Sequence, residues 1–127
     1  MNITKKQKAE SQKESNLALN HWILQKISAL VLIPLVCWFL FTFKDFLYKD
    51  YSSKIIWFKN YTNSFLLSMF LLTAIFHLRL GLTVVIEDYI HNLKTKKLLL
   101  SFIEILCLFL AVVIVIVILI LSLGNNV

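Results

Sequence analysis

One histidine, one glycine and one aspartate follow one another at the spacing of an α-helix along an apolar stretch of the chain. Gly81 follows His77 by four residues, and Asp88 follows it by eleven. Each residue turns an α-helix by about 100°, so these three residues and Val84 form one stripe along a helix. The stripe offers a metal ligand at one end and an acid at the other. Between them is a gap, where glycine lets a flat group or another backbone come close.

His77 lies deep in the membrane helix that we expect here. If this helix leaves the bilayer core near Ile86, His77 is about 15 Å inside, at the midplane. A histidine at that depth is costly and is a functional candidate by default. Two interpretations stay open, namely a neutral imidazole that donates a hydrogen bond to a neighbouring helix and an axial ligand of haem iron. The chain has no C-x-x-C-H motif, so a covalently attached haem is excluded.

The other two histidines are His21 and His91, and both fall at or beyond one membrane interface. Neither shares the depth of His77. A haem with two histidine ligands would therefore need its second ligand from another chain. The sequence predicts half of a shared site and a partner in the membrane.

Membrane helices are the elements that must position these residues. Of the 127 residues, 59% are hydrophobic and 16% are charged, and so small a soluble domain has too much surface to be this apolar. Three apolar runs are each long enough to span a bilayer core of roughly 30 Å. They cover about residues 22–43, 61–86 and 98–123. We predict an all-α integral membrane protein with three transmembrane helices.

The distribution of lysines predicts how these helices are oriented. Eight lysines precede or begin the first run or lie in the loop between the second and third runs, against four in the loop after the first run. Basic loops stay on the inner side, so we expect the N-terminus inside and the C-terminus outside. Residues 1–20 then form a polar inner tail, residues 21–123 the membrane anchor and residues 124–127 a short outer tail. The basic tail is expected to contact lipid headgroups or a partner subunit, and not nucleic acid.

Two full charges lie within the second and third runs. Arg79 is the only arginine of the chain, and Glu104 is the only acidic residue of the third run. Both would lie about 10–12 Å from the same surface if these helices are antiparallel, and charges in lipid nearly always find partners. We expect a buried ion pair. The alternative is that Arg79 reaches headgroups or haem propionates while Glu104 is protonated.

The stretch from His77 to His91 resembles the haem-bearing helix of the hydrophobic membrane anchor (D-type) subunit of succinate dehydrogenase, complex II. In that family a histidine is followed by glycine four residues on, and by Asp-Tyr eleven and twelve residues on. Here those residues are Gly81, Asp88 and Tyr89.

The first apolar run is similar to the family as well, in the segment from His21 to Leu30 and in Pro34-Leu35 and Trp38-Phe39. Family members often have arginine where Lys26 stands, and lysine does not make the same bidentate contact. Lys26 would meet a haem propionate or extend to lipid headgroups. The resemblance covers about residues 20–123.

The resemblance implies one of two hydrophobic subunits that hold a flavoprotein subunit and an iron–sulfur subunit at the membrane. With a cytochrome b type anchor as its partner, the chain would bind one haem b through His77, with Gly81 and Lys26 beside it, and would help form the ubiquinone site. Electrons from succinate would reach ubiquinone, linking the tricarboxylic acid cycle to electron transport. The chain has no flavin motif and no cysteine cluster, so we expect a non-catalytic subunit. The membrane would be a bacterial inner membrane or, alternatively, a mitochondrial one.

The Asp-Tyr pair suits quinone chemistry, which takes two electrons and two protons. A phenol at the membrane edge can donate a hydrogen bond to a quinone carbonyl while the quinone ring stays in the apolar zone. Tyr89 would do this, and Asp88 would orient Tyr89 or an arginine of a partner and lie on a proton path. Otherwise Tyr89 belongs to the aromatic belt of the interface and Asp88 is a helix-end carboxylate.

Two other classes of protein stay open at this point. One is a haem-free structural anchor, in which His77 is a packing residue. The other is a small proton-coupled transporter that works through Arg79 and Glu104. Such transporters usually show repeat symmetry, which is not seen in the three apolar runs. Independently of the class, Ser28 is expected to form a hydrogen bond within its own helix or, alternatively, to line a helix seam.

Overall fold

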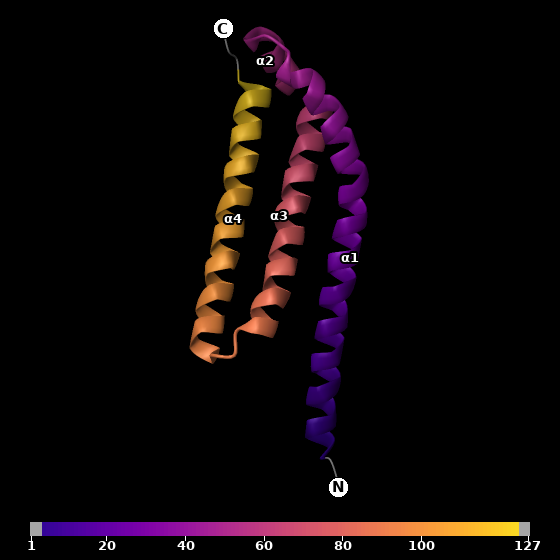
Figure 1. Ribbon diagram of the computed structural model, residues 1–127, viewed down its shortest axis with the longest axis vertical. Coiled ribbons are helices and arrows are strands. Elements are labelled where there is room, and N and C mark those ends of the chain that lie inside the picture. The colour runs from indigo at the N-terminus through magenta and orange to yellow at the C-terminus, as the bar shows by residue number, and fades with distance from the viewer. Residues whose placement is uncertain (1–3, 125–127) are drawn as a thin grey trace.

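Four helices make up the computed structural model, which describes residues 4–124 apart from the side chains of Lys6 and Glu14 (Figure 1). They are α1 (Lys5–Leu47), α2 (Tyr51–Lys59), α3 (Tyr61–Tyr89) and α4 (Leu93–Leu123). The described residues contain no strand. Helices α1, α3 and α4 are long and apolar enough to cross a membrane. These findings confirm the all-α class and the three predicted membrane-spanning helices.

The membrane helices are longer than the apolar runs that predict them. Helix α1 begins at Lys5 and not near residue 22, so most of the polar tail is helical. The Thr4 side chain accepts a hydrogen bond from the Gln7 backbone, and the Gln7 side chain accepts one from the Thr4 backbone, which is a capping box. Lysine, glutamine, glutamate and alanine are good helix formers. An apolar run therefore marks where lipid begins, whereas propensity and capping decide where the helix begins.

The short helix α2 is an element that the apolar runs do not predict. Its nine residues follow the end of α1 and pack back on it through aromatic rings. The ring centroid of Phe46 lies 5.2 Å from that of Trp57 and 5.8 Å from that of Phe58. Helix α2 also contacts α3 and α4. It therefore covers the end of the molecule where α1 gives way to α3.

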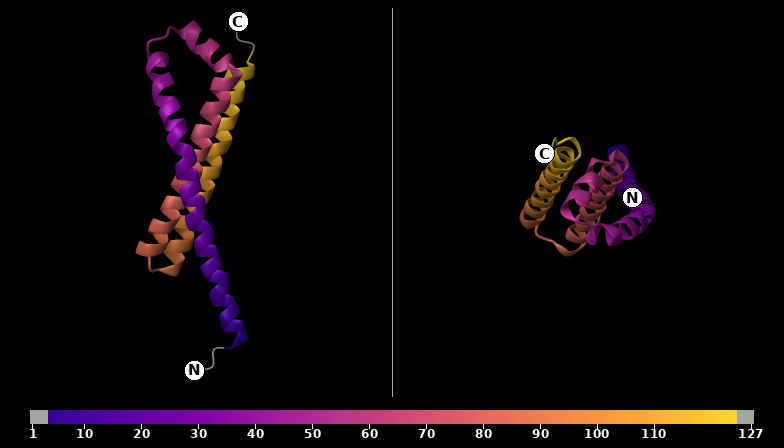
Figure 2. Two further views of the ribbon diagram at one scale, coloured as in Figure 1. Left: turned by 90° about the vertical axis from the view of Figure 1, so that its right-hand side faces the viewer. Right: turned by 90° about the horizontal axis from the view of Figure 1, so that it is seen from above.

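Helix α3 lies between the other two membrane helices. It packs against α1 on one side and α4 on the other (Figures 1 and 2). Only residues 90–92 join α3 to α4, so these two helices run antiparallel. The start of α1 and the α3–α4 connection lie at one end of the molecule, and α2 and the end of α4 lie at the other. Helix α1 projects well beyond the other helices at the end where it starts (Figure 2).

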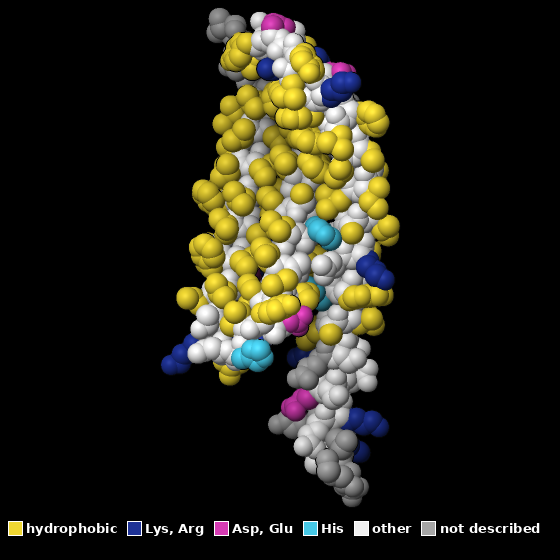
Figure 3. Space-filling view, viewed as in Figure 1, with side chains coloured by type: hydrophobic (Ala, Val, Ile, Leu, Met, Phe, Trp, Pro, Cys, Tyr) yellow, Lys and Arg dark blue, Asp and Glu magenta, His cyan; other side chains and the backbone are white. Residues whose placement is uncertain are grey.

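The interior of this three-helix layer is small. Among the described residues, the buried side chains are five apolar ones and two serines: Leu35, Leu80, Ile86, Cys107, Ile118, Ser28 and Ser64. Apolar side chains cover the middle of the face seen in Figure 3, and most charged ones lie toward its two ends. Apolar surface of this extent is typical of contact with lipid or with other membrane helices.

Candidate functional site

The seam between α1 and α3 joins His77 to Ser28. The His77 Nδ1 atom lies 2.9 Å from the Ser28 Oγ atom. The same hydroxyl donates a hydrogen bond to the carbonyl oxygen of Gln25, also at 2.9 Å. Ser28 is buried and the His77 side chain is half-buried. One ring nitrogen of His77 is therefore held by the chain itself. The other, Nε2, has no hydrogen-bond partner among the residues that the structure describes.

Helix α1 also covers the glycine of the stripe. A Cβ atom added to Gly81 would lie 3.6 Å from Gln25 Nε2, which is ordinary van der Waals contact. Gln25 and Ser28 are three residues apart on α1, and His77 and Gly81 are four apart on α3, so each pair shares one helix face. The expected gap at Gly81 thus faces α1 of the same chain. Gln25 is the contact that the sequence analysis missed, although its spacing from Ser28 within an apolar run is a visible signal.

Lys26 is on a different face of α1. It precedes Ser28 by two residues, which is about 200° around the helix, so it points away from α3. Its ammonium nitrogen lies 3.8 Å from the centroid of the Trp22 ring. Such a cation–π contact contributes about 0.5–1 kcal/mol at an exposed site. The structure does not bring Lys26 to His77 within this chain.

Asp88 and Tyr89 occupy the last turn of α3, where the structure leaves both exposed. The Tyr89 side chain is 78% exposed. Eleven residues separate Asp88 from His77, a distance of roughly 17 Å along the helix axis. Asp88 lies on the same helix face as His77, whereas Tyr89 lies about 120° away from His77. The two residues are therefore at a helix end, accessible from outside the chain, and apart from the His77–Ser28 seam.

Arg79 and Glu104 are brought together by the packing of α3 on α4. The Arg79 Nη2 atom lies 2.6 Å from Glu104 Oε1. The two side chains are 44% and 62% exposed, so the ion pair lies at the surface of this chain and not in its interior. They border a cavity of about 230 Å³ whose other lining is Leu72, Ile75, Phe76, Cys107, Leu108 and Ala111.

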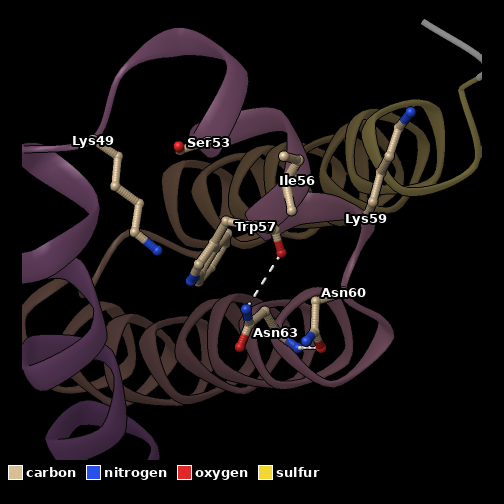
Figure 4. Close-up of a pocket in the computed structure, with 7 residues that line it drawn as sticks. All are labelled: Lys49, Ser53, Ile56, Trp57, Lys59, Asn60 and Asn63. Carbon is tan, nitrogen blue, oxygen red and sulfur yellow. Dashed lines mark hydrogen bonds between the residues drawn. The ribbon is translucent and has the colours of Figure 1, made fainter.

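A cavity of about 540 Å³ lies at the other end of the molecule, where α2 meets the start of α3 (Figure 4). The Asn63 side chain there donates a hydrogen bond to the Trp57 carbonyl at 3.3 Å. The lining is Lys49, Ser53, Ile56, Trp57, Lys59, Asn60 and Asn63. No residue of the His77 stripe is among them. Among the side chains that the structure describes, no three His, Cys, Asp or Glu residues gather as a metal site.

Residues 1–121 match the family model of the succinate dehydrogenase/fumarate reductase transmembrane subunit. The chain belongs to this family. The match includes both helices of the His77–Ser28 seam and nearly all of α4. No solved structure matches the chain.

Individual relatives point to the anchor subunits within this family. The hydrophobic membrane anchor subunits of succinate dehydrogenase from Rickettsia typhi and Rickettsia prowazekii are each 31% identical to this chain over 109 residues. These matches cover 83% of this chain and 84% of each relative. The succinate dehydrogenase membrane anchor subunit of Reclinomonas americana is 31% identical over 91 residues, 69% of this chain and 76% of the relative. The resemblance found in the sequence is thereby confirmed.

Proposed function

We propose that this transmembrane subunit anchors a succinate dehydrogenase (succinate:ubiquinone oxidoreductase) to the membrane. It would hold the flavoprotein and iron–sulfur subunits together with a second, cytochrome b type anchor. The observation that carries the proposal is the family match over residues 1–121 of a chain with three membrane-spanning helices. The role belongs to the tricarboxylic acid cycle and to respiratory electron transport. We place the complex in a bacterial inner membrane, with the mitochondrial inner membrane as the alternative.

His77 would be the ligand that this chain gives to a haem b shared with the second anchor. Its Nδ1 atom is engaged by Ser28, which leaves Nε2 for the iron. Metal-bound histidines usually hold a hydrogen bond at the other ring nitrogen, so the arrangement fits a haem ligand. When bound, haem b exchanges one electron at a time. His77 would hold it from the apolar part of α3, together with a ligand from the second anchor.

Tyr89 and Asp88 are the residues that would serve ubiquinone. Both are exposed at the end of α3, where the chain leaves the apolar zone. The Tyr89 hydroxyl would donate a hydrogen bond to a quinone carbonyl. The Asp88 carboxylate would orient Tyr89 or an arginine of a partner and would lie on the path of protons to the quinone. The start of α1 projects from the same end. We therefore propose that the catalytic subunits dock there, which requires this end to face the inside.

Purification through a tag on this chain tests the proposal. We expect a flavoprotein, an iron–sulfur protein and a second membrane subunit to co-purify, with succinate-dependent quinone reduction and b-type bands in the reduced-minus-oxidised spectrum. The same subunits without b-type bands would mean a haem-free anchor. Purification without these subunits would contradict the anchor function, and proton transport by the chain alone would indicate a transporter.

A further inference from the structure

We propose that Ser28 is a positioning residue for His77. Its hydroxyl would hold the imidazole in the tautomer that is protonated at Nδ1 and would aim Nε2 at the haem iron. This inference rests on the proposed haem ligation by His77 and adds a second residue of the same chain to that site.

The hydrogen-bond pattern around Ser28 sets the position of each proton. A serine hydroxyl has one proton to donate and two lone pairs to accept. The Gln25 carbonyl oxygen, 2.9 Å from Ser28 Oγ, can only accept, so it takes the hydroxyl proton. The oxygen of Ser28 must then accept from the His77 Nδ1 atom, also 2.9 Å away. A neutral imidazole carries one proton, so Nε2 presents the lone pair that a metal needs.

The opposite tautomer is disfavoured by the surroundings of His77. If Ser28 turned its proton toward Nδ1, the imidazole proton would move to Nε2. No acceptor for an Nε2 proton contacts His77 within the described part of the chain, and a polar hydrogen without a partner is costly in an apolar zone. The geometry thus leaves Nε2 with a lone pair that can bind a metal, and not with a proton.

Helix packing holds Ser28 in place. Its exposed fraction is 5%, and α1 and α3 lie close enough there that a Cβ atom added to Gly81 would be 3.6 Å from Gln25 Nε2. A ligand histidine whose Nδ1 proton is bound by an oxygen is a stronger donor to iron, and this favours the oxidised, more positive iron. Loss of the Ser28 hydroxyl should therefore raise the reduction potential of the haem.

The test compares variants in the assembled complex, by redox titration of the haem and by the low-spin ferric EPR signal. Ser28→Ala should retain haem but show a higher midpoint potential and shifted EPR g-values. Ser28→Thr, which keeps a hydroxyl, should restore both. Ser64→Ala is the matched control, because Ser64 is equally buried at 5% but lies near the start of α3, away from His77, and donates its hydrogen bond to the Phe58 carbonyl of α2. A potential and an EPR signal of wild-type value in Ser28→Ala would overturn the inference.

If the Ser28→Ala complex does not assemble, a second pair of variants, Ser28→Thr and Ser28→Val, tests the inference. Threonine and valine have nearly the same volume and differ in the hydroxyl. Wild-type potential in Ser28→Thr with an altered or lost haem in Ser28→Val supports the role of Ser28, and equal behaviour of the two refutes it. The variant His77→Leu separates this inference from the proposed function. An unchanged haem spectrum in His77→Leu refutes ligation by His77. A changed spectrum in His77→Leu together with a wild-type midpoint potential in Ser28→Ala refutes only the role of Ser28.

Discussion

Single residues of α3 face different neighbours because each helical step turns by about 100°. His77 meets Ser28 on α1, while Arg79, about 200° further round, meets Glu104 on α4. Tyr89, at the end of the helix, is exposed. One helix thus carries a candidate haem ligand, an ion pair and a candidate quinone contact without mutual interference.

Replacing His77 by leucine tests the ligand. We expect His77→Leu to change or abolish the b-type spectrum and to lower the amount of assembled complex several-fold, because the haem would lose one of its two protein bonds. His91→Leu is the control, since His91 is an exposed histidine outside the membrane helices. It should keep the wild-type spectrum. An unchanged spectrum and haem stoichiometry in His77→Leu would reject the assignment.

Removing the hydroxyl of Tyr89 tests the quinone contact. Tyr89→Phe should lower succinate-dependent quinone reduction by up to about 10-fold, since a neutral hydrogen bond contributes about 0.5–1.5 kcal/mol. Succinate oxidation by a soluble dye should stay at the wild-type rate. Tyr61→Phe is a matched control, because Tyr61 is 75% exposed at the opposite end of the same helix. Parallel loss of both activities would instead indicate a structural role for Tyr89.

Helix α3 is the element that holds the layer together. A polar contact ties it to α1, an ion pair ties it to α4, and a three-residue connection sets α4 antiparallel to it. The exposed position of the ion pair has a consequence in a membrane. Charges at a lipid-facing surface are costly, so the pair is best covered by another membrane helix.

The ion pair between α3 and α4 is testable by a double-mutant cycle. Arg79→Leu and Glu104→Leu should each reduce the complex recovered per membrane, because an unpaired charge at a helix centre costs about 2.5–3.5 kcal/mol on insertion scales. The double variant should recover part of the loss, since no charge is left unpaired. Strictly additive losses would reject the pairing in the membrane.

The approach of α1 to α3 makes a graded prediction at Gly81. A methyl group there would meet only the end of the Gln25 side chain, at 3.6 Å. Gly81→Ala should therefore leave the haem spectrum and the yield of complex unchanged. A leucine side chain has no room at this contact, so Gly81→Leu should separate the helices, weaken the Ser28–His77 contact and alter the spectrum. A normal spectrum in Gly81→Leu would contradict close packing of the seam.

The molecule as a whole is a layer with few buried side chains and long apolar surfaces. Lipid alone would suit the apolar faces, but the exposed ion pair and the half-buried His77 both call for protein neighbours. This architecture is typical of a subunit, because a thin layer becomes a complete bundle only when further helices pack on it.

Sidedness is the prediction that belongs to the whole molecule. Alkaline phosphatase, which is active only outside the cytoplasm, should be active when fused after Gly124 and inactive when fused after Asn92. The reason is the excess of lysines at the end where α1 starts and α3 meets α4. A cytoplasmic fluorescent protein at the same two positions should give the inverse result. Activity at Asn92 alone would reverse the orientation.

The sequence alone determines the membrane spans, because lipid demands long apolar segments whatever the helices touch. It also places His77, Gly81 and Asp88 on one face, since helical periodicity is local. The short loop between the second and third spans also places Arg79 and Glu104 at the same depth in the membrane. The apolar run does not predict the start of α1 at Lys5, because a polar helical segment outside the membrane has no hydrophobic signal. The packing of α2 is likewise hidden, since nine residues leave no membrane signal.

Tertiary structure decided which neighbour covers each face. Periodicity says that His77 and Gly81 point the same way, but not that they point at Gln25 and Ser28. The rotation of one helix against another depends on the summed fit of side chains along the whole seam, and no local pattern contains that sum. The same reason explains why the predicted ion pair lies at the surface of the chain. Sequence spacing brings Arg79 level with Glu104, and only packing sets how deeply the pair is covered.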